Sequence, residues 1–127
     1  MHIEVESIPA ERLSREGQEE CSTDIRRRVE AAREIQRRRY ADDPDGIRIN
    51  AQLSARNLNA ACQTSPEAHE LLLLSCEKLK LSNRAYTRVL KVARTIADLD
   101  ASDSVQQHHL AEAIGYRNLD RGDWAER

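Results

Sequence analysis

The sequence predicts an all-α fold for this chain of 127 residues: a helical bundle of about five helices with a short extended or disordered N-terminal segment. The strongest observation is residues 81–99, whose apolar and polar side chains fall on opposite halves of a helical wheel drawn at about 100° per residue. Aromatic residues make up 3% of the chain and phenylalanine is absent, so the core must consist of Leu, Ile, Val and Ala, which suits helix-on-helix packing. The breaks between apolar stretches are short, as in helical bundles.

The helix over residues 81–99 is expected to be the centre of the bundle, because an apolar arc of half a circle offers contact to several neighbours. Its other half is polar and includes a basic row at spacing i, i+4, i+7, namely Arg84, Arg88 and Lys91. Arg84 lies in the first turn, where the helix dipole disfavours a cation, so its position points to a role other than helix stability. The pattern leaves open a solvated stripe that pairs with glutamates of the preceding helix: Glu67, Glu70 or Glu77.

Three parts of the chain are predicted: an N-terminal strand remnant and linker over 1–21, a helical domain over 22–121, and a frayed tail over 122–127. Ile3 and Val5 alternate with glutamates, which is typical of a strand, but a helical chain offers a lone strand no partner. Either this segment is disordered, or its sheet lies in other polypeptide. Disorder is expected up to about residue 20.

The first helix is predicted over residues 24–39, after the N-cap residues 22–24 and with apolar side chains at helical spacing. A loop follows over 41–46, then a connector over 47–52, expected to be extended. A short helix over 55–62 is capped by Ser54.

Two further helices flank the central one. Pro66 suits the first position of a helix whose run of leucines over 71–74 is expected to be largely buried. Ser82 or Asn83 should cap the central helix. The last helix is predicted over about 105–116, and its candidate caps are Asp103 and Ser104.

Composition and motifs exclude several functions. The formal net charge of −2 gives no global argument for binding nucleic acid or membrane, and no apolar run is long enough to span a bilayer. The cysteines Cys21, Cys62 and Cys76 are odd in number and form no CxxC motif, so free thiols in a reducing, cytoplasmic compartment are predicted. The four glycines are not spaced for GxxxxGK[ST] or GxGxxG, so this chain cannot hold a nucleotide by itself through either motif.

No metal or nucleophile site is predicted either. His108 and His109 are adjacent, so on a helix their side chains point about 100° apart and cannot both bind one ion easily. His69 does not complete a metal-binding motif such as HxxxH. The thiols lack the nearby histidine and acid that a cysteine nucleophile needs. The chain is therefore not expected to be an enzyme alone.

The first helix carries seven arginines against three acidic residues, which would suit a polyanion. The pairs Arg26–Glu30 and Glu34–Arg38 at i, i+4 instead favour a solvated, salt-bridged face. Contact with DNA stays open as the alternative, through the candidate residues Arg26, Arg27, Arg28, Arg37 and Arg38.

Several motifs carry a resemblance to one family. They are LSNRAYTR at 81–88, KVARTIADL at 91–99 and AEAIGYR at 111–117, with HIEV at 2–5, IRRRVEAAREIQRRR at 25–39 and INAQLS at 49–54. Together they resemble the C-terminal helical lid of magnesium-chelatase-like AAA+ ATPases of the ComM/YifB type, over about residues 1–121.

The resemblance implies an AAA+ lid fold and a part of an ATPase whose core, with its Walker A and B motifs, lies outside this sequence. It implies that Arg84 is the sensor-2 arginine that reaches the γ-phosphate of ATP, and that Arg88 supports it or faces a neighbouring subunit. ATP with Mg²⁺ would be the cofactor of the full-length protein, with none bound by this fragment alone and no metal ligands in the chain. The implied partners are the AAA+ core of the same chain, a homo-hexameric ring and DNA.

Two functions follow as hypotheses. In the first, the chain is a lid that couples the nucleotide state to ring motion in DNA processing, as in natural transformation, or in metal insertion into a porphyrin. In the second, it is a freestanding helical adaptor that binds nucleic acid or protein through helix 24–39. The first makes Arg84 the critical residue, and the second makes the arginines of helix 24–39 critical.

Overall fold

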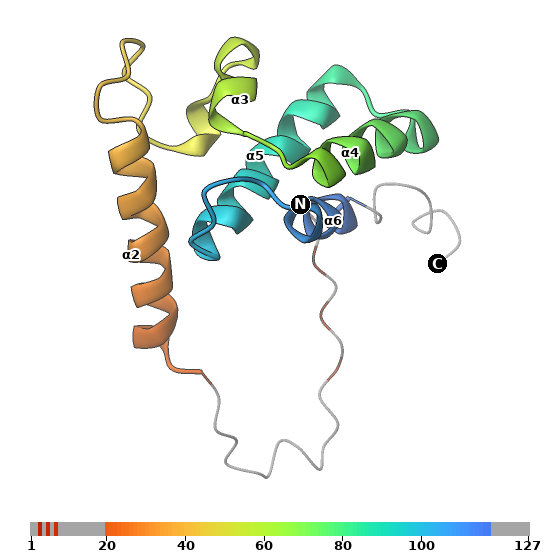
Figure 1. The fold of residues 1–127 in the computed structure, drawn as a ribbon. Helices are drawn as coiled ribbons and strands as arrows, with labels where there is room; N and C mark the ends of the chain where they lie inside the picture. The colour runs from red at the N-terminus through yellow and green to blue at the C-terminus, as the bar shows by residue number, and fades with distance from the viewer. Residues whose placement is uncertain (1–2, 4, 6, 8–19, 118–127) are drawn as a thin grey trace.

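The computed structural model describes residues 3, 5, 7 and 20–117, and the described part is all-α, as predicted. Its helices are α2 (Ser22–Arg39), the 3-10 helix η1 (Asn50–Gln52), α3 (Ala55–Ala61), α4 (Pro66–Leu79), α5 (Asn83–Leu99) and α6 (Gln107–Gly115). Figure 1 shows α5 running through the middle of the molecule, with α2 standing to one side of it.

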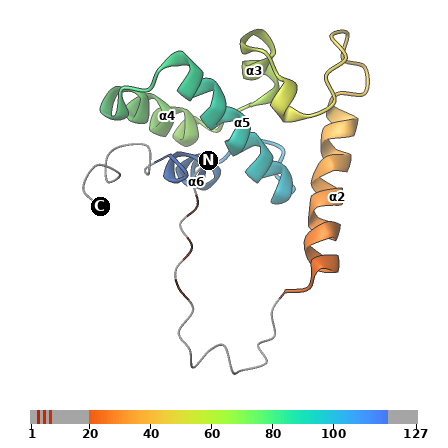
Figure 2. The same cartoon turned by 180° about the vertical axis from the view of Figure 1, so that it is seen from behind.

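Helix α5 is the centre of the packing, since α2, η1, α3 and α6 all contact it. Helix α4 packs on α6, and the view from behind shows these two helices on the side of α5 away from α2 (Figure 2). This arrangement confirms that the apolar half of α5 serves several neighbours.

The core is aliphatic, as the composition requires. Its fully buried side chains include Leu58 of α3, Leu72 of α4, Leu90 of α5 and Leu110 of α6. Small residues of α5, such as Ala93 and Ala97, have no exposed surface and let the neighbouring helices approach closely.

Serines cap α4 and α5, and for α5 this confirms Ser82 of the two candidates Ser82 and Asn83. The Ser65 hydroxyl accepts the Ala68 N–H at 3.2 Å, and the Ser82 hydroxyl accepts the Ala85 N–H at 3.3 Å. Each cap satisfies one of the backbone donors that a helix leaves unpaired in its first turn. Pro66 takes the first position of α4, where no N–H is needed.

Several boundaries differ from the predictions. Helix α2 begins at Ser22, with Cys21 at the N-cap position, and the connector expected to be extended contains η1. Helix α6 begins at Gln107, after Gln106 at the N-cap, rather than after Asp103 or Ser104. The reason is Val105, which is held outside the helix by backbone bonds with residues 63 and 65.

Some predicted positions are wrong or lie outside the described residues. Leu73 and Leu74 are 52% and 45% exposed, because only one side of α4 faces the bundle. Ile3, Val5 and Ser7 are not in a strand, while the rest of the predicted strand over 1–8 and the tail over 122–127 lie outside the described part. The division at residues 21 and 121 stays a prediction.

The largest departure concerns the polar half of α5. Arg94 and Asp98, placed on a solvated face by the wheel, are 0% and 1% exposed. Arg94 Nε donates to Asp98 Oδ1 at 3.1 Å, and its Nη1 donates to the Asp103 carbonyl at 2.8 Å. Arg94 therefore joins α5 to the loop that leads to α6.

Asp98 also holds α2. Arg39 Nη1 at the end of α2 donates to Asp98 Oδ2 at 3.0 Å, and its Nη2 donates to Oδ1, so the pair is bidentate. Asn50 Nδ2 donates to Asp98 Oδ2 at 2.7 Å, and the Tyr40 hydroxyl donates to Asn50 Oδ1 at 2.7 Å. Within the described residues, no buried side-chain N or O lacks a hydrogen-bond partner.

Burial alone would raise the pKa of Asp98, but hydrogen bonds from Arg39 and Asn50 and the charge of Arg94 outweigh it, so its pKa lies below the ordinary value. For Arg39, burial alone would lower the pKa, yet the hydrogen bonds and charge of Asp98 raise it. Both groups are thus ionised at neutral pH, and each satisfies the other in a site with little water.

We predict that Asp98→Asn destabilises the fold by about 3–5 kcal/mol, because it leaves two arginines without their buried counter-charge. Urea unfolding followed by circular dichroism measures this. Asn50→Ala removes an amide that donates to Asp98 and accepts from the Tyr40 hydroxyl but leaves the ion pairs of Asp98 in place, and it should cost about 1–3 kcal/mol. Asp42→Asn, at an exposed loop position, should be neutral. Equal stability of the Asp98→Asn and Asp42→Asn proteins would contradict this account.

A pH dependence follows from the lowered pKa of Asp98. A carboxyl whose pKa is lower in the folded state contributes stability that is complete above its unfolded pKa, about 4, and is lost as the pH falls below it. Unfolding free energies measured from pH 6 downward should therefore fall less steeply below about pH 4 for Asp98→Asn than for the unaltered chain. If the unfolding free energies of the two proteins fall equally steeply below about pH 4, Asp98 does not control the loss of stability in acid.

Candidate functional site

The first turn of α5 carries the leading candidate residue. Arg84 is the second residue of α5, two positions after its Ser82 cap, and it is exposed. Within the described residues it forms no ion pair, so the pairing with glutamates of α4 that the sequence left open is not seen at Arg84. A cation at this end of a helix gains nothing from the dipole, and Arg84 has no counter-charge among the described residues. Its guanidinium is available to an anion from outside the chain.

The rest of the basic row divides in two. Arg88 lies one turn after Arg84, is exposed and likewise forms no ion pair with any described residue. Lys91 is half-buried, and its Nζ donates to the Ala51 carbonyl at 2.8 Å. Lys91 therefore ties α5 to η1, while Arg84 and Arg88 stay accessible.

The arginines of α2 are mostly occupied by ion pairs. Arg27 lies 3.3 Å from Asp24, Arg28 lies 2.7 Å from Glu20, and Glu34 pairs with Arg37 at 2.7 Å and Arg38 at 3.2 Å. Of the two predicted pairs, Glu34–Arg38 is confirmed, whereas Arg26 is exposed and forms no ion pair within the described part. These exposed pairs contribute little to stability, but they neutralise part of the basic face.

The two adjacent histidines do converge on one group, contrary to the sequence-based geometry. Asp100 Oδ2 lies 3.0 Å from His109 Nε2 and 3.5 Å from His108 Nε2. The ligand atoms of the three residues all lie within 4.8 Å of one another, a separation that a metal ion can bridge. The spacing of the two histidines on α6 could not indicate this contact, because Asp100 lies in the preceding loop and reaches both rings from outside α6. Whether the three residues hold a metal ion is a separate question.

Hydrogen bonding nevertheless argues against a metal at this cluster. His109, 1% exposed, accepts the Gln106 N–H at its Nδ1 at 3.0 Å. A neutral imidazole then carries its proton on Nε2, which donates to Asp100 and has no lone pair for a metal. The hydrogen bond from His109, with a smaller one from His108, holds the pKa of Asp100 below its ordinary value. His109 is thus a cap of α6 and a link to the end of α5.

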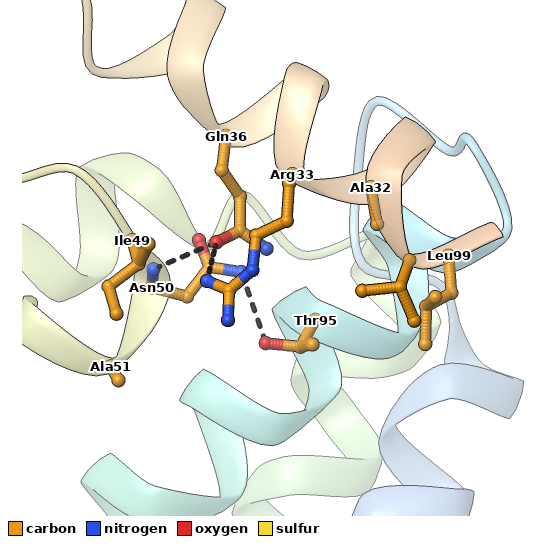
Figure 3. A pocket seen from close by; sticks show the side chains of 9 residues that line it. Ala32, Arg33, Gln36, Ile49, Asn50, Ala51, Thr95 and Leu99 are labelled. Atoms are coloured by element: carbon orange, nitrogen blue, oxygen red, sulfur yellow. Dashed lines mark hydrogen bonds between the residues drawn. The ribbon is translucent and has the colours of Figure 1, made fainter. Parts of the chain in front are cut away.

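A groove of about 300 Å³ lies between α2, η1 and the C-terminal half of α5 (Figure 3). Its lining residues are Val29, Ala32, Arg33, Gln36, Ile49, Asn50, Ala51, Thr95 and Leu99. Asn50 is tied to both long helices: its N–H donates to Gln36 Oε1 at 3.3 Å, and its Nδ2 donates to Thr95 Oγ1 at 3.1 Å. The polar atoms therefore bond one another, and the remaining lining is largely apolar.

The cysteines carry no catalytic arrangement. All three are free thiols, as predicted. Burial raises the pKa of the Cys62 thiol to about 11, so it stays protonated and inert at neutral pH. Burial also raises the pKa of Cys76, and Cys21 is exposed at the start of α2.

Comparison with known proteins identifies the family. Residues 19–117 match the family described as magnesium chelatase, subunit ChlI C-terminal. The chain belongs to this family. The likeness to ComM/YifB-type magnesium-chelatase-like proteins that the motifs suggest is thereby confirmed.

Individual relatives agree with the family. The chain is 39% identical to Competence protein ComM of Haemophilus influenzae over 122 residues, which is 95% of this chain and 23% of that protein. It is 41% identical over 102 residues to the uncharacterized protein YifB of Escherichia coli, covering 80% of this chain and 19% of that protein. The uncharacterized protein Rv2897c of Mycobacterium tuberculosis is 33% identical over 98 residues. The chain thus spans about a fifth of the length of these relatives and corresponds to a part of a larger protein.

Among the described residues, no helix has the length and apolar character needed to cross a bilayer.

We predict that the histidine cluster is structural. His109→Ala should lower the unfolding free energy by about 1–3 kcal/mol, because it removes a buried side chain that bonds both Gln106 and Asp100. His108→Ala, at an exposed ring, should stay within about 0.5 kcal/mol of the unaltered chain. Thermal melts with and without Zn²⁺ complete the test. A zinc-dependent rise in Tm that both substitutions abolish would establish a metal site instead.

Proposed function

We propose that this chain is the C-terminal lid of a magnesium-chelatase-like AAA+ ATPase and supplies Arg84 as a sensor-2 arginine to ATP held by the core domain of the same full-length protein. The observation that supports this most is the state of Arg84: exposed, without an ion pair in the described part, and fixed in the first turn of a capped helix against the helix dipole. The family membership and the motif around Arg84 agree with it.

The chemistry suits this role. A guanidinium presents a planar fork of donors that matches phosphate oxygens, and it stays charged at any physiological pH. The N-terminal end of a helix also favours an anion, so a phosphate bound at the start of α5 would turn the unfavourable position of Arg84 into a favourable one. The chain itself carries neither phosphate-binding loop motif, so the core must hold the nucleotide with its Mg²⁺.

The rigidity of α5 would couple the nucleotide state to the motion of the lid. Arg84 and Asp98 lie 14 residues apart on one helix, about 21 Å along its axis. At the far end, Asp98 bonds Arg39 of α2 and Arg94, which holds the loop before α6. A displacement of Arg84 between ATP and ADP states would therefore move the lid as one body. Arg88, exposed one turn further along, would support Arg84 or face a neighbouring subunit.

The assembly, the location and the process in which the protein acts are part of the same proposal. A homo-hexameric ring and a cytoplasmic location are what the family resemblance implies. DNA processing during natural transformation is supported by the name of the Haemophilus influenzae relative, a competence protein.

A freestanding adaptor that binds nucleic acid through α2 is the second candidate. Arg26 favours it, because its side chain is exposed and forms no ion pair with a described residue, so it can bind a phosphate without breaking such a pair. The ion pairs of Arg27, Arg28, Arg37 and Arg38 weaken it, because these contacts compete with a polyanion.

The decisive experiment compares ATP turnover of the full-length protein with and without Arg84→Ala. A loss of about ten- to a thousand-fold is expected, the order seen when a contact to transition-state charge is removed. Arg56→Ala is the matched control, since Arg56 is an exposed arginine in the first turn of α3. Turnover unchanged by Arg84→Ala would reject the sensor role.

The adaptor hypothesis predicts a different result with the chain by itself. It requires salt-dependent binding of duplex or single-stranded DNA that weakens on combined Arg26→Ala, Arg27→Ala and Arg28→Ala and is unaffected by Arg84→Ala. The lid proposal expects the reverse order of importance in the full-length ATPase assay. Fluorescence anisotropy at two salt concentrations separates the two.

A further inference from the structure

The exposed side of α4 combines leucines with acidic residues. Glu70, Leu73, Leu74 and Glu77 follow one another at i, i+3, i+4 and i+7, so they share one face of the helix. All four side chains are exposed, the two leucines by 52% and 45%. Neither glutamate forms an ion pair with a described residue, and the exposed Lys78 lies about 100° further round the helix than Glu77. We call these two leucines and two glutamates the acidic face.

The N-terminal part of α2 carries the opposite charge beside exposed apolar side chains. Arg26, Val29 and Arg33 follow one another at i, i+3 and i+7 and so share one side of α2. Val29 is 46% exposed, and it lines the groove together with Arg33 and with Leu99 of α5, which is 50% exposed. Arg33 donates to Gln36 Oε1 at 3.5 Å, and neither arginine forms an ion pair within the described part of the chain. We call Arg26, Val29, Arg33 and Leu99 the basic face.

The two faces match in charge, in apolar content and in spacing. Each has two like charges seven residues apart, which is about 10.5 Å along a helix axis. Each also has two half-exposed apolar side chains beside these charges. If the two helices lie side by side, both guanidiniums can therefore meet a carboxylate while the leucines of α4 reach the mouth of the groove.

Within one chain the two faces lie far apart, since Figures 1 and 2 both show α2 and α4 on opposite sides of α5. A contact between them joins two copies. Because it uses two different surfaces, each copy can offer its acidic face to one neighbour and its basic face to another, which produces a closed ring or an open row. A single pair of helix faces buries little area, so the contact requires copies that are already held together by other parts of the full-length protein.

We propose that the acidic face of one copy docks on the basic face of the next, with Leu74 beside Val29, so that these domains meet head to tail in the assembled full-length protein. This rests on the part of the proposed function in which full-length copies assemble, but it requires neither nucleotide nor Arg84. Charge selects this pairing, since acidic face on acidic face, or basic on basic, would bring like charges together. A second copy is the favoured partner because the chain itself supplies both halves of the contact.

Cross-linking of paired thiols tests the contact. Val29→Cys and Leu74→Cys are placed in one full-length chain that also carries Cys21→Ser, and a short bis-maleimide links thiols of neighbouring copies. We expect a ladder of linked dimers, trimers and longer species on a denaturing gel, and only background from either substitution alone. The matched control exchanges Val29→Cys for Ala31→Cys, since Ala31 is exposed on the opposite side of α2, and it should give background linking. The Cys21→Ser protein without an added cysteine defines that background.

Reversal of the charges provides a second test on the same cross-linking pair. Glu70→Lys with Glu77→Lys should lower the linked yield by about tenfold or more, and so should Arg26→Glu with Arg33→Glu. The protein with all four changes should recover the yield, because each pair again has opposite signs. All four residues are exposed, so circular dichroism should report an unchanged fold.

Four outcomes would overturn the proposal. One is the absence of a ladder, and another is an equal ladder from the Ala31→Cys control. Linked dimers from Leu74→Cys alone would show that two acidic faces meet each other. DNA binding by the 127-residue chain that Arg26→Glu with Arg33→Glu abolishes, together with no ladder, would assign the basic face to nucleic acid. Because Arg84→Ala changes turnover and not cross-linking, a failure here is distinguishable from a failure of the sensor role.

Discussion

A single buried carboxylate determines how the two longest helices meet. Asp98 accepts hydrogen bonds from Arg39 of α2, from Asn50 of η1 and from Arg94 of its own helix. A carboxylate that is 1% exposed is stable only if its lone pairs are filled, and here three donors from three elements fill them. Because Arg39 is the last residue of α2, its bidentate pair with Asp98 holds the C-terminal end of α2 against α5.

This constraint explains why the other end of α5 is suited to function. The C-terminal half of α5 is fixed by the Asp98 network, its apolar face by α3 and α6, and its start by the Ser82 cap. Arg84 is therefore presented on a rigid backbone while its own side chain stays exposed and without a counter-charge among the described residues. A site held rigidly by the fold, but left electrostatically incomplete, is suited to a ligand supplied from outside.

The helices and their order along the chain could be predicted from the sequence, because the signals that set them are local. These signals agree with the structure: the periodicity of residues 83–99, the serines before α4 and α5, and Pro66. A helical wheel cannot distinguish a polar side chain that faces solvent from one that is buried and paired with an opposite charge. Arg94 and Asp98 are an i, i+4 pair that local spacing could have suggested, but Arg39 lies 59 residues from Asp98 and only the tertiary fold joins them. Likewise, the spacing of His108 and His109 on one helix cannot reveal that both rings approach Asp100, because Asp100 lies outside that helix.

The sensor role of Arg84 is tested most directly by a structure of the full-length protein with a non-hydrolysable ATP analogue. If α5 carries Arg84 to the γ-phosphate of ATP, the Arg84 guanidinium will lie within about 3 Å of γ-phosphate oxygens, the distance of a charge-assisted hydrogen bond, with the Asp98–Arg39 pair intact. A structure in which the nucleotide is bound and the first turn of α5 faces solvent, with Arg84 far from the phosphates, would contradict it.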